Sequence, residues 1–169
     1  MKSYFIVFDG IDGSGKGEMV NRLHNYLFSK NKKFGILTTR EPTYGRYGSQ
    51  VREILAKEKD PKQSAEKCLD LFVKDRQDHL KSTIEPFLKQ NKAAVNIVIC
   101  DRYYYSTIAF QHTQGLNIDL VIEKNKKFLK PDIAFILDLP VDIALSRLEM
   151  RGDKKEKFEQ KEFMVFFGL

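Results

Sequence analysis

The stretch Gly10-Ile11-Asp12-Gly13-Ser14-Gly15-Lys16-Gly17 decides the fold, because it joins two segments of different periodicity. Before it, residues 3–9 read Ser-Tyr-Phe-Ile-Val-Phe-Asp, an apolar run typical of a buried parallel strand. After it, apolar residues at positions 19, 20, 23, 26 and 27 have helical spacing. A glycine-rich turn between a strand and a helix is the setting of a phosphate-binding loop, the P-loop. We therefore expect residues 10–17 to bind phosphates.

The chemistry of this loop follows from its residue types. Glycines let backbone N–H groups point inward at a phosphate chain, and the helix that follows adds a partial positive charge. Lys16 would reach the β and γ phosphates. The alternative, a glycine-rich turn without a ligand, is disfavoured by the spacing of the glycines and the lysine. Gly17 stands where the pattern has Ser or Thr to hold Mg²⁺, so we expect a water to take that place.

Composition predicts one folded domain that binds small charged molecules. The chain has 169 residues, 42% of them apolar, and a net charge of +6, which suits a single α/β domain over residues 1–169. Its cations do not form one basic stripe, so nucleotide binding is favoured over nucleic-acid binding. Cys68 and Cys100 are expected to be free thiols rather than metal ligands. With no signal peptide and no apolar run of membrane length, we expect a cytoplasmic protein without membrane contact.

Strands and helices are expected to alternate along the chain. Further strands are predicted at residues 34–38, 95–100 and 133–137. Helices are predicted at 16–29, 48–57, from about 60 to a break or kink near 82–85 ahead of Pro86 with a short helix to residue 90, and at 104–114, 117–128 and 141–151. This order predicts a three-layer parallel sheet with helices on both faces. Ligands then bind beyond the carboxyl ends of the strands, where Asp9, Thr38, Asp101 and Asp138 lie.

Two charged residues follow the third strand directly. Asp101 can hold Mg²⁺ through water, and Arg102 can bind a phosphate with two parallel hydrogen bonds. The alternative, a surface ion pair, is disfavoured by their place at the end of an apolar strand. Arg40 follows the second strand and is expected to reach the same cleft.

Phe72 and Arg76 lie four residues apart, hence on one face of a helix. Such a pair can stack on a nucleobase and hydrogen-bond to its edge. Periodicity alone favours another interpretation, with Phe72 in the core and Arg76 a solvated charge.

Several segments together resemble the thymidylate kinases, a family of P-loop nucleoside monophosphate kinases. The resemblance extends from about residue 4 to residue 163, and the segment Asp101-Arg102-Tyr103-Tyr104-Tyr105-Ser106 is more specific than the P-loop. The matching segments are residues 8–16, Thr39-Arg40-Glu41-Pro42, Phe72 with Arg76, residues 101–111, and residues 131–138.

The resemblance implies transfer of the γ-phosphoryl group of ATP to thymidine monophosphate, with Mg²⁺ as cofactor, in a homodimer. It implies that Lys16 and the loop residues Gly10, Ile11, Asp12, Gly13, Ser14, Gly15 and Gly17 bind the ATP phosphates and that Arg147 lies near the adenine. Asp12 would contact the sugar 3′-hydroxyl or organise Mg²⁺. Arg40 and Arg102 would bind the acceptor phosphate. Phe72, Arg76, Ser106 and Gln111 would form the base and sugar pocket.

The chain also departs from the family pattern. The resemblance implies a lid at about residues 152–160, where Lys157 stands in place of a catalytic arginine and supplies charge without the planar fork. A fifth strand is expected to be missing, which leaves about four strands and an ATP site less well preserved than the acceptor site. Two alternatives remain at this point. One is a nucleotide-binding protein with little or no kinase activity, and the other is a monophosphate kinase of different base preference.

Overall fold

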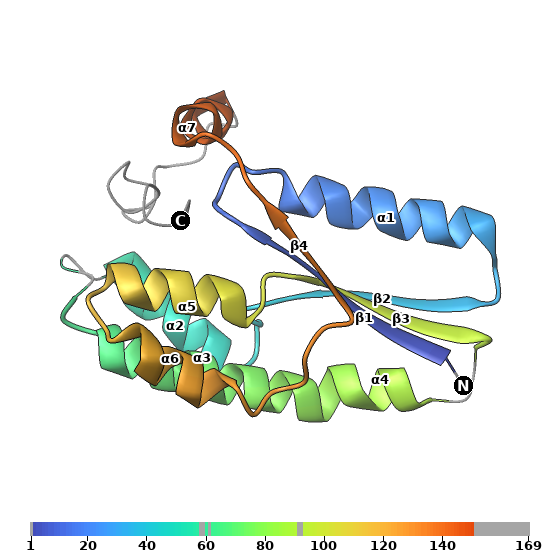
Figure 1. Ribbon diagram of the computed structural model, residues 1–169, viewed down its shortest axis with the longest axis horizontal. Coiled ribbons are helices and arrows are strands. Elements are labelled where there is room, and N and C mark those ends of the chain that lie inside the picture. The colour runs from blue at the N-terminus through green and yellow to red at the C-terminus, as the bar shows by residue number, and fades with distance from the viewer. Residues whose placement is uncertain (1, 58–59, 61, 91–92, 151–169) are drawn as a thin grey trace.

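A single parallel sheet organises the molecule. The computed structural model describes residues 2–57, 60, 62–90 and 93–150. Within these residues the sheet has four strands in the order β2-β3-β1-β4, and every neighbouring pair is parallel (Figure 1). The strands are β1 (Lys2–Gly10), β2 (Phe34–Arg40), β3 (Val95–Asp101) and β4 (Ile133–Leu137).

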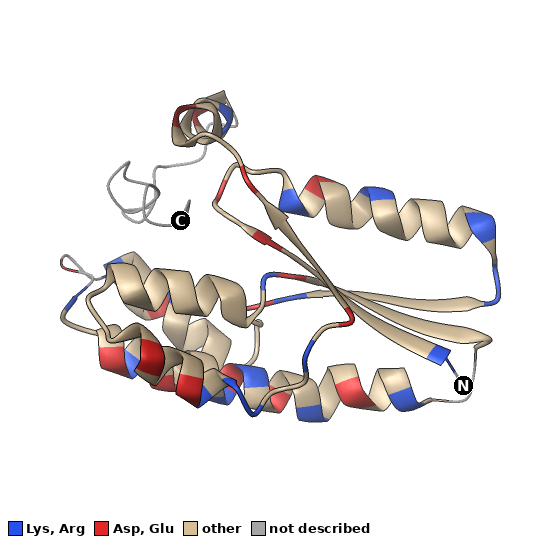
Figure 2. Cartoon of the chain, in the orientation of Figure 1, with Lys and Arg blue, Asp and Glu red and all other residues tan. Residues whose placement is uncertain are grey.

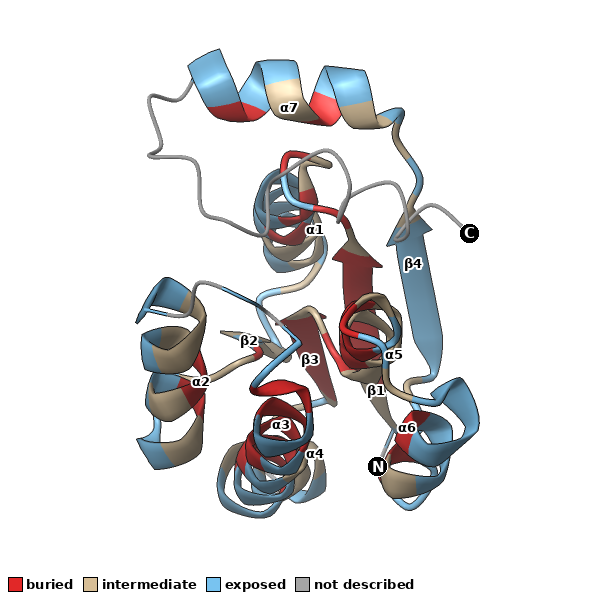
Figure 3. Cartoon of the chain, turned by 90° about the vertical axis from the view of Figure 1, so that its left-hand side faces the viewer, coloured by how far each residue is buried: buried red, intermediate tan, exposed pale blue. Residues whose placement is uncertain are grey.

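Helices cover both faces of this sheet. Helix α1 lies on one face, and α3, η1, α4 and α5 lie on the other (Figures 1 and 3). Helix α7 lies beyond the carboxyl ends of the strands (Figure 3). The helices are α1 (Lys16–Lys30), α2 (Arg46–Lys57), α3 (Ala65–His79), the π-helical turn η1 (Leu80–Ile84), α4 (Glu85–Lys89), α5 (Tyr104–Thr113), α6 (Ile118–Asn125) and α7 (Val141–Met150).

Alternate residues of β1 pack against helices on opposite faces of the sheet. Phe5 and Val7 point into a cluster with η1 and the start of α5, which includes Leu80, Ile84 and Tyr103. Their neighbours Ile6 and Phe8 point into a second cluster that contains Val20 of α1, with Ile97 and Ile99 of β3. A central parallel strand buried on both faces has this continuous apolar sequence. The predicted three-layer fold is confirmed.

In place of the break or kink predicted near residues 82–85, the chain has the π-helical turn η1. It stays helical from Ala65 to Lys89, which includes the short helix predicted up to residue 90, and η1 absorbs the proline. The N–H of Glu85 bonds to the carbonyl of Leu80, five residues back, which widens this turn. Proline lacks an N–H and its ring crowds the carbonyl four residues before it, so a wider turn accommodates it.

The ends of β2 and α6 differ from the predictions by two or three residues. Strand β2 continues to Arg40 rather than residue 38, because its backbone pairs with β3 as far as Asp101. Helix α6 ends at Asn125 rather than residue 128. Its predicted cap is confirmed, since the Asn117 side chain accepts hydrogen bonds from the N–H groups of Asp119 and Leu120.

Positive and negative side chains mix over the helical surface. Lys and Arg alternate with Asp and Glu along α3, α4 and α6 (Figure 2). No helix in the described part of the chain is both long and apolar enough to cross a bilayer.

Candidate active site

The P-loop wraps around the start of α1 with three glycines in left-handed conformations. Gly13 has φ of 80°, and a Cβ atom there would overlap with the carbonyl oxygen of Ala144 in α7. Any larger residue is therefore strained at this position. No side chain caps α1, so its first N–H groups are left for an anion.

Lys16 is buried at the base of this loop. Its Nζ donates a hydrogen bond to the carbonyl of Ile11 at 2.7 Å and lies 3.8 Å from the Asp12 carboxylate. Burial, followed by the nearby Arg102 cation, lowers the pKa of Lys16 from 10.5 to about 8. The carboxylates of Asp12, Asp101 and Asp9 offset this effect only in part, and a phosphate chain would add further negative charge beside the ammonium group.

Arg102 links the P-loop to the start of α5. Its guanidinium donates to the carbonyl of Gly10 at 2.9 Å and to Ser106 Oγ at 2.8 Å, and pairs with Asp12 at 2.5 Å. Arg102 has φ of 69°, a left-handed conformation that costs a non-glycine residue free energy and is concentrated at functional sites. Burial raises the pKa of the Asp12 carboxyl, but Arg102, Lys16 and Arg40 outweigh it, so the pKa is lowered overall.

Asp9 was predicted only to mark the working edge, and the structure gives it a larger part. Its buried carboxylate accepts the N–H groups of Gly10, Tyr103 and Ser106 and the Ser106 hydroxyl. A carboxylate from β1 thus caps α5, a helix distant in sequence. The contact between Asp9 and α5 could not be predicted from the local sequence, because this helix begins 95 residues later in the chain.

Asp101, the residue predicted to hold Mg²⁺ through water, has unused hydrogen-bonding capacity. Its Oδ1 is buried without a hydrogen-bond partner, and so is Oγ of Ser14, a residue predicted to bind the ATP phosphates, so each atom can accept a ligand or a water. Gly17 has open space around it and offers no hydroxyl. Within the described residues, no group of three or more His, Cys, Asp and Glu side chains forms a metal cage. This fits an ion held by one carboxylate, water and nucleotide phosphates.

Arg40 and Arg147 flank the loop from two sides. Arg40 is exposed at the end of β2, close enough to lower the pKa of Asp12. Arg147 of α7 donates to the carbonyl of Gly13 at 3.4 Å, which places it against the P-loop. The predicted role of Arg147 at the adenine remains a prediction.

The residues predicted for the base pocket belong to two helices, Phe72 and Arg76 to α3 and Ser106 and Gln111 to α5, and these helices contact each other. Phe72 is 8% exposed and packs edge-on against Phe110 of α5, with ring centroids 6.2 Å apart. Gln111 is fully buried, and its amide nitrogen and oxygen have no hydrogen-bond partner. An unpaired buried amide is unfavourable, so a ligand or water that bonds to Gln111 would stabilise this region.

Arg76 is not the solvated charge that periodicity favoured. It is 1% exposed, and its Nε donates to Glu41 Oε2 at 2.8 Å. Its terminal nitrogens donate to Thr107 Oγ1 at 2.9 Å and to Asn125 Oδ1. Glu41 also contacts the ring of His79, whose other nitrogen meets Thr39. Glu41 and Thr107 belong to segments of the family resemblance but were not singled out, and nothing in the sequence pattern pointed to Asn125.

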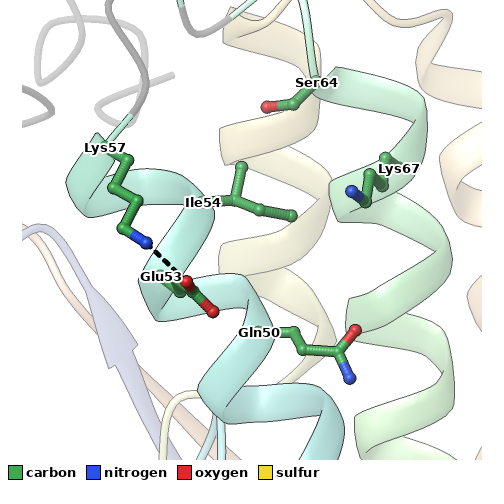
Figure 4. A pocket seen from close by; sticks show the side chains of 6 residues that line it. All are labelled: Gln50, Glu53, Ile54, Lys57, Ser64 and Lys67. Carbon is green, nitrogen blue, oxygen red and sulfur yellow. Dashed lines mark hydrogen bonds and ion pairs between the residues drawn. The ribbon is translucent and has the colours of Figure 1, made fainter.

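A groove lies apart from this site. It has a volume of about 480 Å³, lies between α2 and α3, is lined by residues such as Glu53 and Lys67, and contains none of the predicted site residues (Figure 4). The predicted lid at 152–160, with Lys157, lies outside the described residues.

Known proteins match this chain over most of its length. The family model for thymidylate kinase matches residues 8–167. A probable thymidylate kinase of Pyrococcus horikoshii is 40% identical over 159 residues, which are 92% of this chain and 75% of that protein. A thymidylate kinase of Desulfotalea psychrophila is 34% identical, over 94% of this chain and 75% of that protein. The crystal structure of thymidylate kinase from Ehrlichia chaffeensis has a TM-score of 0.70 at 34% identity, over 89% of this chain and 84% of that one.

The parallel sheet, the P-loop and the cationic groups at one sheet edge define a P-loop kinase of nucleotides. The comparisons narrow this class further. The chain belongs to the thymidylate kinase family, as the sequence resemblance implied.

Proposed function

We propose that this chain transfers the γ-phosphoryl group of ATP to thymidine monophosphate, which gives ADP and thymidine diphosphate. Family membership supports the reaction. One structural observation supports the site: the buried ammonium of Lys16 and the Arg102–Asp12 pair lie at the same loop, on the carboxyl edge of the sheet. Phosphoryl transfer needs in-line positioning and neutralised charge more than covalent help.

On the donor side, Lys16 and the amides of residues 10–17 would hold the phosphate chain, with Arg147 beside them. Asp101 would hold Mg²⁺ through water, aided by the Ser14 hydroxyl. When bound, the ion neutralises charge that develops on the phosphate oxygens. The depressed pKa of Lys16 supports this role, since a phosphate chain would restore the balance of charge around it.

On the acceptor side, Arg40 and Arg102 would bind the monophosphate. Its attacking oxygen is already ionised near neutral pH, so the site needs no strong general base. Asp12 holds Arg102 in place and would meet the sugar hydroxyl. Phe72, Arg76, Ser106 and Gln111 would surround the thymidine, and Lys157 would contribute transition-state charge from the lid.

A coupled assay with ATP and a panel of monophosphates tests this proposal. We expect thymidine monophosphate to be the preferred acceptor, and Lys16→Met to lower turnover at least about 100-fold, the usual loss when one charge-stabilising donor is removed. Lys30→Met, in the last turn of the same helix, is the matched control and should leave turnover unchanged.

Other outcomes of the assay have distinct meanings. Undiminished turnover by Lys16→Met would contradict the P-loop assignment. Preference for another monophosphate would favour a kinase of different base preference, and binding without turnover would favour a nucleotide-binding protein. Assembly as a homodimer and a cytoplasmic location remain predictions of this proposal.

A further inference from the structure

The guanidinium of Arg76 packs against two aromatic rings and is hydrogen-bonded around its edge. Its central carbon lies over the rings of Tyr103 and Phe128, 5.0 and 5.7 Å from their centroids. Its edge is held by Glu41, Thr107 and Asn125, each at most 3% exposed. These partners come from three separate segments of the chain, so the group is held in one orientation before any ligand binds.

These hydrogen bonds use only some of the N–H groups of Arg76. A guanidinium has five N–H groups and no acceptor. Three point at Glu41, Thr107 and Asn125, which leaves one N–H on each terminal nitrogen. The charge is already balanced by the Glu41 carboxylate. What remains suits a neutral group that presents an acceptor, and it suits neither a second donor nor a phosphate.

Asn125 is the partner whose own orientation is determined by the fold. It closes α6 at 2% exposure, and its Nδ2 donates to the carbonyl of Val121 at 2.8 Å. The amide is therefore turned so that its oxygen faces Arg76 Nη1. Through this contact α6, which supplies none of the predicted site residues, directs one of the two terminal nitrogens of Arg76.

We propose that Asn125 is a positioning residue for base recognition. By accepting one N–H of Nη1 it aims the other at the base, so that a base with an acceptor at that edge, such as thymine, binds better than one with a donor there, such as cytosine. This inference rests on the proposed function, in which Arg76 contacts the base.

The test compares binding of two monophosphates by calorimetry. Asn125→Val fills most of the same volume without an acceptor. We expect it to weaken binding of thymidine monophosphate about tenfold, the effect of losing one hydrogen bond to a charged group. Binding of deoxycytidine monophosphate should change by less than about twofold, so selectivity falls. Turnover at saturating thymidine monophosphate should stay the same, because Asn125 does not act at the phosphates.

Two further variants separate positioning from general destabilisation. Asn125→Asp keeps an acceptor oxygen for Arg76 Nη1 but loses the donor to the Val121 carbonyl, so it should keep more of the wild-type selectivity than Asn125→Val does. Asn117→Ala removes the cap of the same helix without a contact to Arg76, so it should lower the melting temperature and leave selectivity unchanged.

The outcomes distinguish this inference from the proposed function. If Asn125→Val keeps the selectivity of the wild-type protein, or if Asn117→Ala loses it equally, the inference is wrong. Because selectivity is measured by binding, this result does not depend on turnover. A wild-type protein that binds both monophosphates but phosphorylates neither would instead contradict the proposed function.

Discussion

Lys16 holds a buried charge that the free protein balances incompletely, and this has a measurable consequence. Its pKa of about 8 should rise when a phosphate chain binds beside it. At about pH 8.5 nucleotide binding should therefore take up as much as about one proton. Calorimetry in two buffers of different ionisation enthalpy measures this uptake. Lys16→Met should abolish it, and uptake of equal size in that variant would assign the proton to another group.

The same shift makes stability depend on pH. The pKa of Lys16 is about 8 in the folded chain against 10.5 unfolded, so between these values the unfolded state binds more protons. The destabilisation from burying the charge is full below pH 8 and fades as the pH rises toward 10.5. We expect Lys16→Met to melt above the wild-type protein at neutral pH, and the difference to shrink near pH 10. A difference that does not change with pH would argue against a depressed pKa.

Gly17 leaves room for the hydroxyl that the P-loop pattern provides. Nothing lies within 4 Å of a Cβ placed there. We expect Gly17→Ser to lower the Mg²⁺ concentration needed for half-maximal turnover, by up to about tenfold, because a ligand held by the protein replaces a water. Gly17→Ala is the control, since it shares the gain in helix propensity of about 0.5 kcal/mol without a hydroxyl. Equal Mg²⁺ dependence in both variants would show that the hydroxyl does not reach the ion.

Among the secondary-structure elements, α5 depends on a residue outside itself. Asp9 accepts the N–H of Tyr103, which directly precedes α5, and the N–H and hydroxyl of Ser106 in its first turn. Asp9→Asn turns an acceptor into a donor there, and we expect a loss of about 2–3 kcal/mol in unfolding free energy, as for buried hydrogen bonds to a charged group. Urea denaturation measures the loss. Asp138→Asn, an exposed residue after β4, should change stability by less than about 0.5 kcal/mol, and an equal loss there would contradict this account.

Local patterns predicted most elements, and contacts between distant segments explain the rest. The P-loop, α1 and the strands follow from runs of fewer than 20 residues, because phosphate loops and buried strands have local signatures. Arg76 could not be placed this way, since Glu41, Thr107 and Asn125 lie 35, 31 and 49 residues from it. The turn η1 escaped prediction because a proline can be absorbed by widening a helix as well as by ending it.

The whole sheet is unevenly covered. Within the described residues, strands β1 and β3 lie in its middle and β4 is an edge strand, with Ile133, Phe135 and Ile136 43%, 44% and 56% exposed (Figure 3). We expect the amides of β1 and β3 to exchange hydrogen only through global unfolding, and those of β4 at least about tenfold faster. Mass spectrometry after deuterium labelling measures both rates. Equal protection of β4 and β1 would mean that the edge strand opens only with the whole sheet.

Because Asp9 caps α5, the helix N-termini at the carboxyl edge of the sheet differ in their charge environment. Among the helices that begin at this edge, the protein's own carboxylate already occupies the start of α5, whereas the start of α1 has no side-chain cap. The positive end of α5 is thus neutralised within the protein, and that of α1 remains available to a ligand. We expect this asymmetry to orient a molecule with an anionic head and a neutral tail, its head toward α1 and its tail toward the neutral Arg76–Glu41 pair. The two ends of a nucleotide would then be distinguished before any particular base is recognised.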